Sequence, residues 1–217
     1  MQTRTKYLVN LAILSAMAYV VMVVGRIPVV LFLKYDPKDV IIVIGGLIYG
    51  PMASFMISLV VSFVEMITVS DNGWIGFVMN VLSTCCFACT AAYIYKKKQK
   101  LSGAVVGLIC GGLLSVVIMM LWNYLLTPIY MGIPRQAVVA LFLPAILPFN
   151  VLKVALNGAI TMLIYKPLVR ALRKAELIPP SNAASAPGGK KSVSALLISA
   201  VVLVTCILSV LALRGII

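Results

Sequence analysis

Strongly polar side chains interrupt an apolar stretch of the sequence at Asn150, Lys153 and Asn157. On a helix these offsets of 0, 3 and 7 residues place the three side chains within about 60° of one another. A lysine in hydrocarbon costs roughly 2.5–3.5 kcal/mol on insertion scales, so its presence there favours a functional role. An ammonium flanked by two amides can hydrogen-bond a polar solute. Alternatively, Lys153 lies only about 7 Å from the predicted start of its helix and extends to the membrane interface.

Further polar residues fall at the same side of the membrane under the topology derived below. They are Asp36, Asp39, Glu65, Asn80 and Asn123, each near the outer end of a predicted helix. The acids also have ordinary explanations, as interfacial residues or helix caps. The inner halves of the helices carry mostly Ser and Thr. This uneven distribution predicts a polar pocket that opens to the outside.

Aromatic residues gather at the same level of the membrane. They are Tyr35, Trp74, Trp122, Tyr124 and Tyr130. An interfacial aromatic belt accounts for most of them. One or two could instead stack on a planar ligand.

Catalysis and metal binding are not expected from this sequence. It contains no histidine and none of the motifs G-x-x-x-x-G-K-[ST], H-E-x-x-H or G-x-S-x-G. Cys86 and Cys89 form a C-x-x-C spacing, but they lie within an apolar run and no second ligand pair follows. The same holds for Cys85, Cys110 and Cys206, which are expected to pack as small apolar residues. A transport process driven by ATP would therefore need its ATPase on another subunit.

The composition requires a lipid environment. Of the 217 residues, 63% are hydrophobic and 11% are charged, whereas soluble domains carry about 25% charged residues. The apolar runs are long and do not alternate, which predicts an all-α integral membrane bundle and not a barrel. The net charge of +13 is distributed between these runs. It therefore indicates membrane topology and not nucleic-acid binding.

The sequence divides into three parts: a six-helix membrane domain over 1–175, a flexible linker over 176–192, and an additional transmembrane helix within 193–217. The six predicted helices cover 7–24, 39–49, 52–69, 74–95, 101–126 and 149–172, and the seventh covers 193–213. Gly50-Pro51 separates the second helix from the third. A polar loop is expected at 33–39, and a proline-broken stretch follows residue 126.

Basic residues set the orientation. With the N-terminus in the cytoplasm, twelve Lys and Arg residues lie inside and five lie outside. This excess follows the positive-inside rule. On the first helix, Ala12 and Ala16 form a small-residue face that permits close contact with another helix.

The chain resembles the substrate-binding S components of energy-coupling-factor (ECF) vitamin transporters, and most closely the riboflavin-specific type. The resemblance covers roughly 5–172, and the order and spacing of several stretches carry it: Phe32–Asp39, Gly45–Pro51, Trp122–Tyr124, Pro128–Tyr130, Pro148–Lys153 and Tyr165–Lys166.

The resemblance implies a six-helix fold in the plasma membrane of a bacterium. It implies that Asn123, Asn150 and Lys153 bind the flavin, and that the 33–39 loop, including Leu33 and Lys34, covers it. Ala12 and Ala16 would meet a transmembrane coupling subunit, which works with two ATPase subunits. In this family the S component binds its vitamin outside and then topples within the membrane. The seventh helix departs from the family pattern.

Three interpretations remain open from the sequence. The chain is a riboflavin-binding S component with no resident cofactor, or an S component for another vitamin, or an ion-coupled carrier of a small solute. A membrane scaffold, whose polar residues only hold helices together, is a further alternative.

Overall fold

The computed structural model describes residues 2–30, 33–70, 72–174 and 190–213. In chain order the elements are α1 (Gln2–Gly25), β1 (Ile27–Val30), β2 (Leu33–Tyr35), α2 (Lys38–Tyr49), α3 (Pro51–Thr68), α4 (Gly73–Thr84), η1 (Cys85–Cys89), α5 (Thr90–Lys97), α6 (Leu101–Met131), α7 (Arg135–Ala140), η2 (Phe142–Ile146), α8 (Leu147–Lys174) and α9 (Lys190–Leu213). The predicted helical membrane bundle is confirmed.

Five helical segments of the described chain are long and apolar enough to cross a membrane. They are Arg4–Gly25, Pro51–Thr68, Gly73–Lys97, Leu101–Ile129 and Phe142–Tyr165. The third of these joins α4 to α5 through the π-helical turn η1. At 12 residues α2 is too short to cross alone, because a helix rises only 1.5 Å per residue.

The predicted division between α2 and α3 is confirmed at Gly50. This glycine has φ +98°, a conformation that side chains with a Cβ rarely adopt. Pro51 then occupies the first turn of α3, where the missing N–H has no helical partner to lose. The residues of α2 from Lys38 to Leu47 are all buried, so this short helix lies at the centre of the bundle.

The structure corrects the predicted end of the fifth helix. The sequence analysis ends it at residue 126, whereas α6 continues through Pro128 to Met131. Pro128 is tolerated because it lies in the last turns, where few further hydrogen bonds are lost. Gly132, at φ +65°, ends the helix in the left-handed conformation.

A β-hairpin stands where the sequence analysis predicts only a polar loop. β1 pairs with β2 in antiparallel orientation, with Ile27 opposite Tyr35 and Pro28 opposite Lys34. Strands this short are not stable alone. Val29 and Tyr35 are buried against residues of α8 and α9, and these tertiary contacts support the hairpin.

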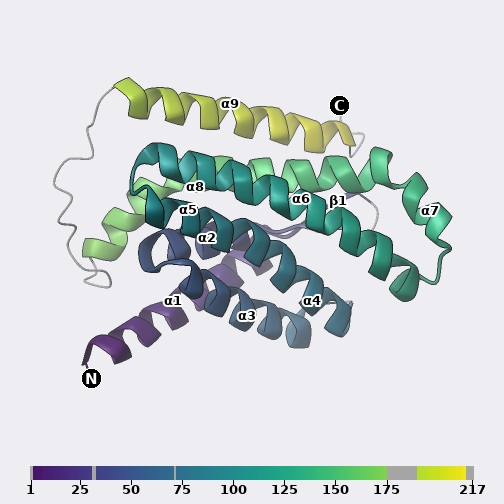
Figure 1. Ribbon diagram of the computed structural model, residues 1–217, viewed down its shortest axis with the longest axis horizontal. Helices are drawn as coiled ribbons and strands as arrows, with labels where there is room; N and C mark the ends of the chain where they lie inside the picture. The colour runs from purple at the N-terminus through teal and green to yellow at the C-terminus, as the bar shows by residue number, and fades with distance from the viewer. Residues whose placement is uncertain (1, 31–32, 71, 175–189, 214–217) are drawn as a thin grey trace.

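The two ends of the bundle differ in the segments they bring together. Figure 1 shows the N-terminus, the α5–α6 turn and the end of α8 at one end, and the hairpin and α7 at the other. The lysine-rich turn at 96–100 therefore lies at the same end as the first residues of α1. This agrees with the grouping of bases used for the predicted orientation.

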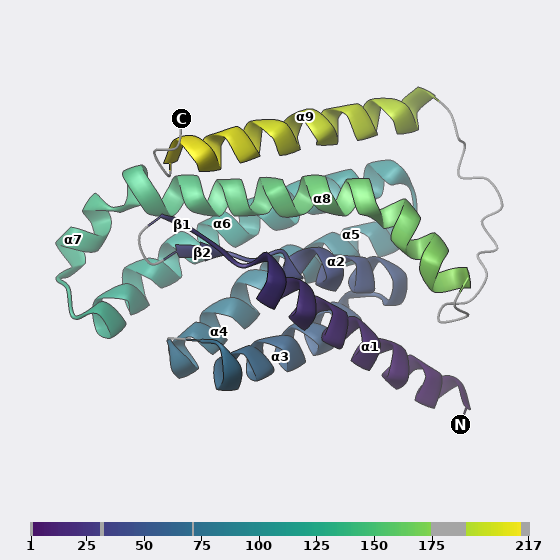
Figure 2. The same ribbon diagram turned by 180° about the vertical axis from the view of Figure 1, so that it is seen from behind.

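α9 lies along α8, on the far side of the bundle from α1 and α3 (Figures 1 and 2). It begins at Lys190, ahead of the predicted start at residue 193. Most of the predicted linker lies outside the described residues. The described apolar part of α9 is Leu197–Leu211, shorter than a full span, so the seventh transmembrane helix stays a prediction.

Candidate functional site

A cavity of about 310 Å³ lies at the hairpin end of the bundle. Its walls come from the end of α1, the hairpin, the α3–α4 turn, and α4, α6 and α8. The lining residues are Arg26, Leu33, Lys34, Asp36, Glu65, Ser70, Asn72, Gly76, Met79, Asn80, Ser83, Met119, Asn123, Phe149, Asn150 and Lys153. Small-molecule sites occupy about 300–1,000 Å³, so the cavity suits a small ligand.

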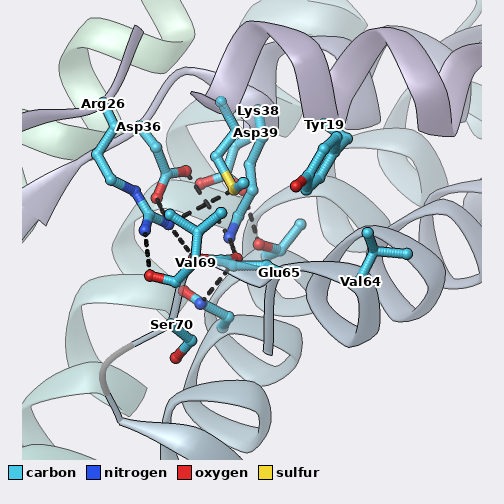
Figure 3. Close-up of polar contacts among 12 residues, drawn as sticks. Tyr19, Arg26, Asp36, Lys38, Asp39, Val64, Glu65, Val69 and Ser70 are labelled. Atoms are coloured by element: carbon cyan, nitrogen blue, oxygen red, sulfur yellow. Dashed lines mark hydrogen bonds and ion pairs between the residues drawn. The ribbon is translucent and has the colours of Figure 1, made fainter. Parts of the chain in front are cut away.

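Glu65 is the centre of one buried group of ion pairs, shown in Figure 3. Its two carboxylate oxygens pair separately with Arg26 and with Lys38. The side-chain amide of Asn80 donates a further hydrogen bond, at 3.1 Å. Lys38 is fully buried, and a buried charge requires such a partner. Glu65 thereby joins the end of α1 and the start of α2 to α3 and α4.

Asp36 lies beside the Glu65 group, between the hairpin and α2. Its carboxylate is 3.9 Å from the Arg26 guanidinium and 3.8 Å from the Lys38 ammonium. Burial raises the pKa of Asp36 above its ordinary value, although Lys38 and Lys153 act in the opposite direction. The Oδ1 atom of Asp36 has no hydrogen-bond partner among the described residues.

Asp39 is the centre of a second buried group. Thr84 donates a hydrogen bond to its Oδ1 at 2.6 Å, and Asn157 donates to its Oδ2 at 3.2 Å. The Lys153 ammonium is 3.4 Å from Oδ2. The Tyr35 hydroxyl donates to the Asn157 side-chain oxygen at 2.9 Å, and burial raises the pKa of this phenol well above its ordinary value. The hairpin, α2, α4 and α8 are therefore connected through Asp39.

Together these groups balance their formal charges. Three carboxylates and three cations form what we call the charge cluster: Arg26, Asp36, Lys38, Asp39, Glu65 and Lys153. Mutual pairing offsets the cost of removing each charge from water. The formal charges of the cluster sum to zero. Its groups can therefore form hydrogen bonds with a ligand, and the cluster itself does not require the ligand to be charged.

Two amides lie on the opposite walls. Asn123 on α6 donates to the Met119 carbonyl at 2.7 Å, and Asn150 on α8 donates to the Ile146 carbonyl at 2.8 Å. Each bond uses one of the two hydrogens of the amide group. Both side chains line the cavity. The second hydrogen of each amide is thus a candidate donor to a ligand.

The predicted binding residues fall into two sets. Leu33, Lys34, Asp36, Asn80, Asn123, Asn150 and Lys153 line the cavity. Tyr35, Asp39 and Asn157 are not among its lining residues and form hydrogen bonds next to Lys153. Ligand binding by either set stays a prediction.

The sequence analysis places Glu65 among the outer polar residues but does not predict its ion pairs with Arg26, which lines the cavity, and with Lys38. Arg26 and Lys38 belong to the five bases that the predicted topology places outside. A signal was present: an acid near the end of an apolar helix, at the same membrane level as two bases, predicts that they pair.

Of the aromatic residues at this level, the described side chains of Tyr35, Trp74, Trp122 and Tyr124 do not line the cavity. Trp74 is 67% exposed, and Tyr124 packs against Phe142. The side chain of Tyr130 lies outside the described residues. Phe149 supplies the aromatic surface of the cavity wall among the described residues, and the sequence analysis does not single it out.

No group of His, Cys, Asp or Glu in the described ranges is arranged to hold a metal ion. All five cysteines are free thiols. Cys89 donates a weak hydrogen bond to the Pro51 carbonyl at 3.4 Å, where η1 meets α3. On α1, Ala12 and Ala16 are exposed on the outer surface of the bundle.

Comparison with known proteins identifies the family. Residues 6–165 match the family described as "ECF transporter, substrate-specific component". Riboflavin transporter RibU of Staphylococcus aureus (strain TCH60) is 27% identical over 79% of this chain and 94% of its own length. Riboflavin transporter FmnP of Bacillus subtilis (strain 168) is 27% identical over 80% of this chain and 99% of its own length.

A solved structure of the S component of a bacterial ECF transporter superposes with a TM-score of 0.67 at 25% identity. The match covers 78% of this chain and 99% of that protein. These relatives are transport proteins, in agreement with the expectation that the chain is not an enzyme. The chain belongs to the substrate-specific components of ECF transporters.

Proposed function

We propose that the chain captures riboflavin or a closely related flavin at the outer face of a bacterial cell membrane. It does so as the binding subunit of an ATP-driven importer, with an ECF transmembrane coupling subunit and two ATPase subunits as partners. Two relatives named riboflavin transporters support the choice of ligand. The observation that carries the proposal is the cavity lined by Asn123, Asn150 and Lys153.

The cavity offers the contacts that an uncharged flavin requires. A flavin presents ring carbonyls and nitrogens as hydrogen-bonding atoms, a flat apolar ring edge, and hydroxyl groups on its side chain. Lys153 has three N–H donors and directs one side of its ammonium to Asp39, which leaves donors for the ligand. Leu33 and Phe149 supply apolar surface for the ring. The charges of the cluster balance one another, so the cluster itself does not require a charged ligand.

The test is direct binding. The protein is purified from riboflavin-supplemented cells, and the quenching of added riboflavin fluorescence is titrated. Lys153→Ala and Asn150→Ala are each expected to weaken binding at least about tenfold, since a buried polar group of the ligand loses its partner. Val151→Ala, at a half-exposed position beside Asn150, is the matched control and should bind as wild type does.

A colourless wild-type protein that quenches no riboflavin would end the flavin proposal. Unchanged affinity in both the Lys153 and the Asn150 variants would show that the ligand binds elsewhere.

Dependence on partners separates an importer subunit from a carrier that works alone. We expect liposomes holding only this chain to accumulate no riboflavin, and liposomes that also hold the coupling subunit and both ATPases to accumulate it with ATP. Exposed Ala12 and Ala16 are the proposed contact with the coupling subunit. Ala12→Leu with Ala16→Leu should abolish uptake while riboflavin affinity is retained.

The proposed orientation places the N-terminus in the cytoplasm and the cavity outside. A cysteine introduced at exposed Lys97, in a variant without native cysteines, should react with impermeant maleimide only after the cells are opened. Labelling of intact cells at this position would reverse the orientation.

A further inference from the structure

α9 lies beyond the region that defines the family, which ends at residue 165. It packs along α8 and also reaches β1 of the hairpin. In Figures 1 and 2 it covers the side of the bundle opposite α1. The helix therefore contacts the site region and leaves the proposed coupling surface on α1 uncovered.

The contact between α9, α8 and the hairpin is a buried apolar cluster. Its buried members, named the brace cluster here, are Val29, Tyr35, Phe149, Leu152, Leu156 and Cys206. Val202, Leu203 and Val210 of α9 pack against it from outside. Val29 and Tyr35 retain only 6% and 7% of their exposure. Side chains of the hairpin, α8 and α9 thus pack together in one apolar cluster.

Two residues belong both to this contact and to the wall of the cavity. Leu33 of β2 lines the cavity and packs against the brace cluster. Phe149 of α8 lines the cavity and is a member of that cluster. The brace cluster therefore joins the packing of α9 to the wall of the cavity. Side chains in such a cluster are closely packed, so a change on one side is transmitted to the other.

Tyr35 links the brace cluster to the polar side of the site. Its side chain is a member of the cluster, and its hydroxyl donates to Asn157, which in turn donates to Asp39. Asp39 is also the ion-pair partner of Lys153. Opening the hairpin would pull Tyr35 away from both sets of contacts at once.

We propose that α9 is an intramolecular brace that holds the β1–β2 hairpin closed over the cavity and so slows release of the bound ligand. If the contacts between α9 and the hairpin form only while the hairpin is closed, they lower the population of the open state. The ligand leaves through that open state, so the brace acts on the dissociation rate more than on the association rate. The identity of the ligand rests on the function proposed above, whereas the closure of the hairpin does not.

The two faces of α9 provide a matched test in the full-length chain. The brace variant is Leu203→Ala with Val210→Ala, which truncates the face toward the brace cluster. The control is Val201→Ala with Val204→Ala, at positions 65% and 56% exposed on the other face. Both remove apolar atoms from the same helix, so a role in lipid anchoring alone would affect them equally.

The first measurement needs no ligand. Amide hydrogen exchange is followed in nanodiscs for the peptide that contains residues 27–35. Exchange there should be about tenfold faster in the brace variant and unchanged in the control, while exchange in α6 stays as in wild type. Equal exchange of the hairpin in the folded brace variant and in wild type would overturn the proposal.

The second measurement is the dissociation rate of riboflavin, from recovery of its fluorescence after dilution. The expected result is release about tenfold faster in the brace variant, with association changed less than threefold. Equal release rates in all three proteins would also overturn the brace. If the wild-type protein binds no flavin, the proposed function fails, and the exchange experiment still decides the brace. If the double variant does not insert, Cys206→Ala, a smaller truncation in the same cluster, takes its place.

Discussion

Two buried acids serve this molecule in different ways. Glu65 pairs with two cations, Arg26 and Lys38, and itself lines the cavity. Asp39 pairs with one cation, Lys153, and does not line the cavity. From this contrast we expect Glu65 to fix the root of the hairpin and Asp39 to orient the ammonium of Lys153. Both acids are buried, and each has a paired cation that lines the cavity; they differ in the number of cations that each one pairs with.

The largest effect is expected for Glu65→Gln. It leaves Arg26 and Lys38 with one carboxylate between them, and removal of one partner from a buried pair costs about 3–5 kcal/mol. The protein should lose much of its thermal stability in detergent, measured as the Tm of intrinsic fluorescence. Adding Lys38→Met should recover part of that loss, because it removes the stranded charge. An unchanged Tm in the single variant would remove the distinction between the two acids.

A smaller loss of stability and a larger loss of binding are expected for Asp39→Asn. The amide is nearly isosteric with the carboxylate, but it no longer neutralises Lys153 and presents an N–H where acceptors are needed. Riboflavin affinity should fall about tenfold, while the Tm falls less than in Glu65→Gln. Titration and thermal unfolding on one preparation give both values. If Asp39→Asn lowers the Tm more and leaves affinity intact, the assigned roles are reversed.

The smallest effect is expected for Thr84→Val. It removes the 2.6 Å hydrogen bond to Asp39 and leaves the ion pair with Lys153 in place. Stability should fall by about 1 kcal/mol, and affinity should change by about twofold at most. Thr205→Val, where the hydroxyl is exposed and bonds only within α9, is the isosteric control and should be neutral. A tenfold loss of affinity in Thr84→Val would place Thr84 among the residues that orient Lys153.

Most of the helical fold was predictable from the sequence because hydrophobic runs and chain punctuation act locally. Gly50-Pro51 separated α2 from α3, since one residue needs φ +98° and the next lacks an N–H. The hairpin was not predictable, because strands of four and three residues gain their stability from α8 and α9. Their register is a tertiary property.

The gathering of the predicted polar residues at one end of the bundle was also predictable, but their detailed arrangement was not. Asn123, Asn150 and Lys153 come from two helices and line one cavity, as their positions along those helices indicated. Which of Asp36 and Asp39 would line it depends on how the chain turns from β2 into α2. That turn is set by the pairing of Glu65 with Lys38, a contact across 27 positions of the sequence.

The balanced charge cluster has an electrical consequence. Moving one elementary charge through a membrane potential requires about 2.3 kcal/mol per 100 mV. The three carboxylates and three cations at the hairpin end sum to zero. If this end of the bundle moves through the bilayer with a neutral ligand, the cluster itself performs no net work against the voltage. The membrane potential would then act on the charge of Lys34, which lines the cavity outside the cluster, and not on the six paired groups.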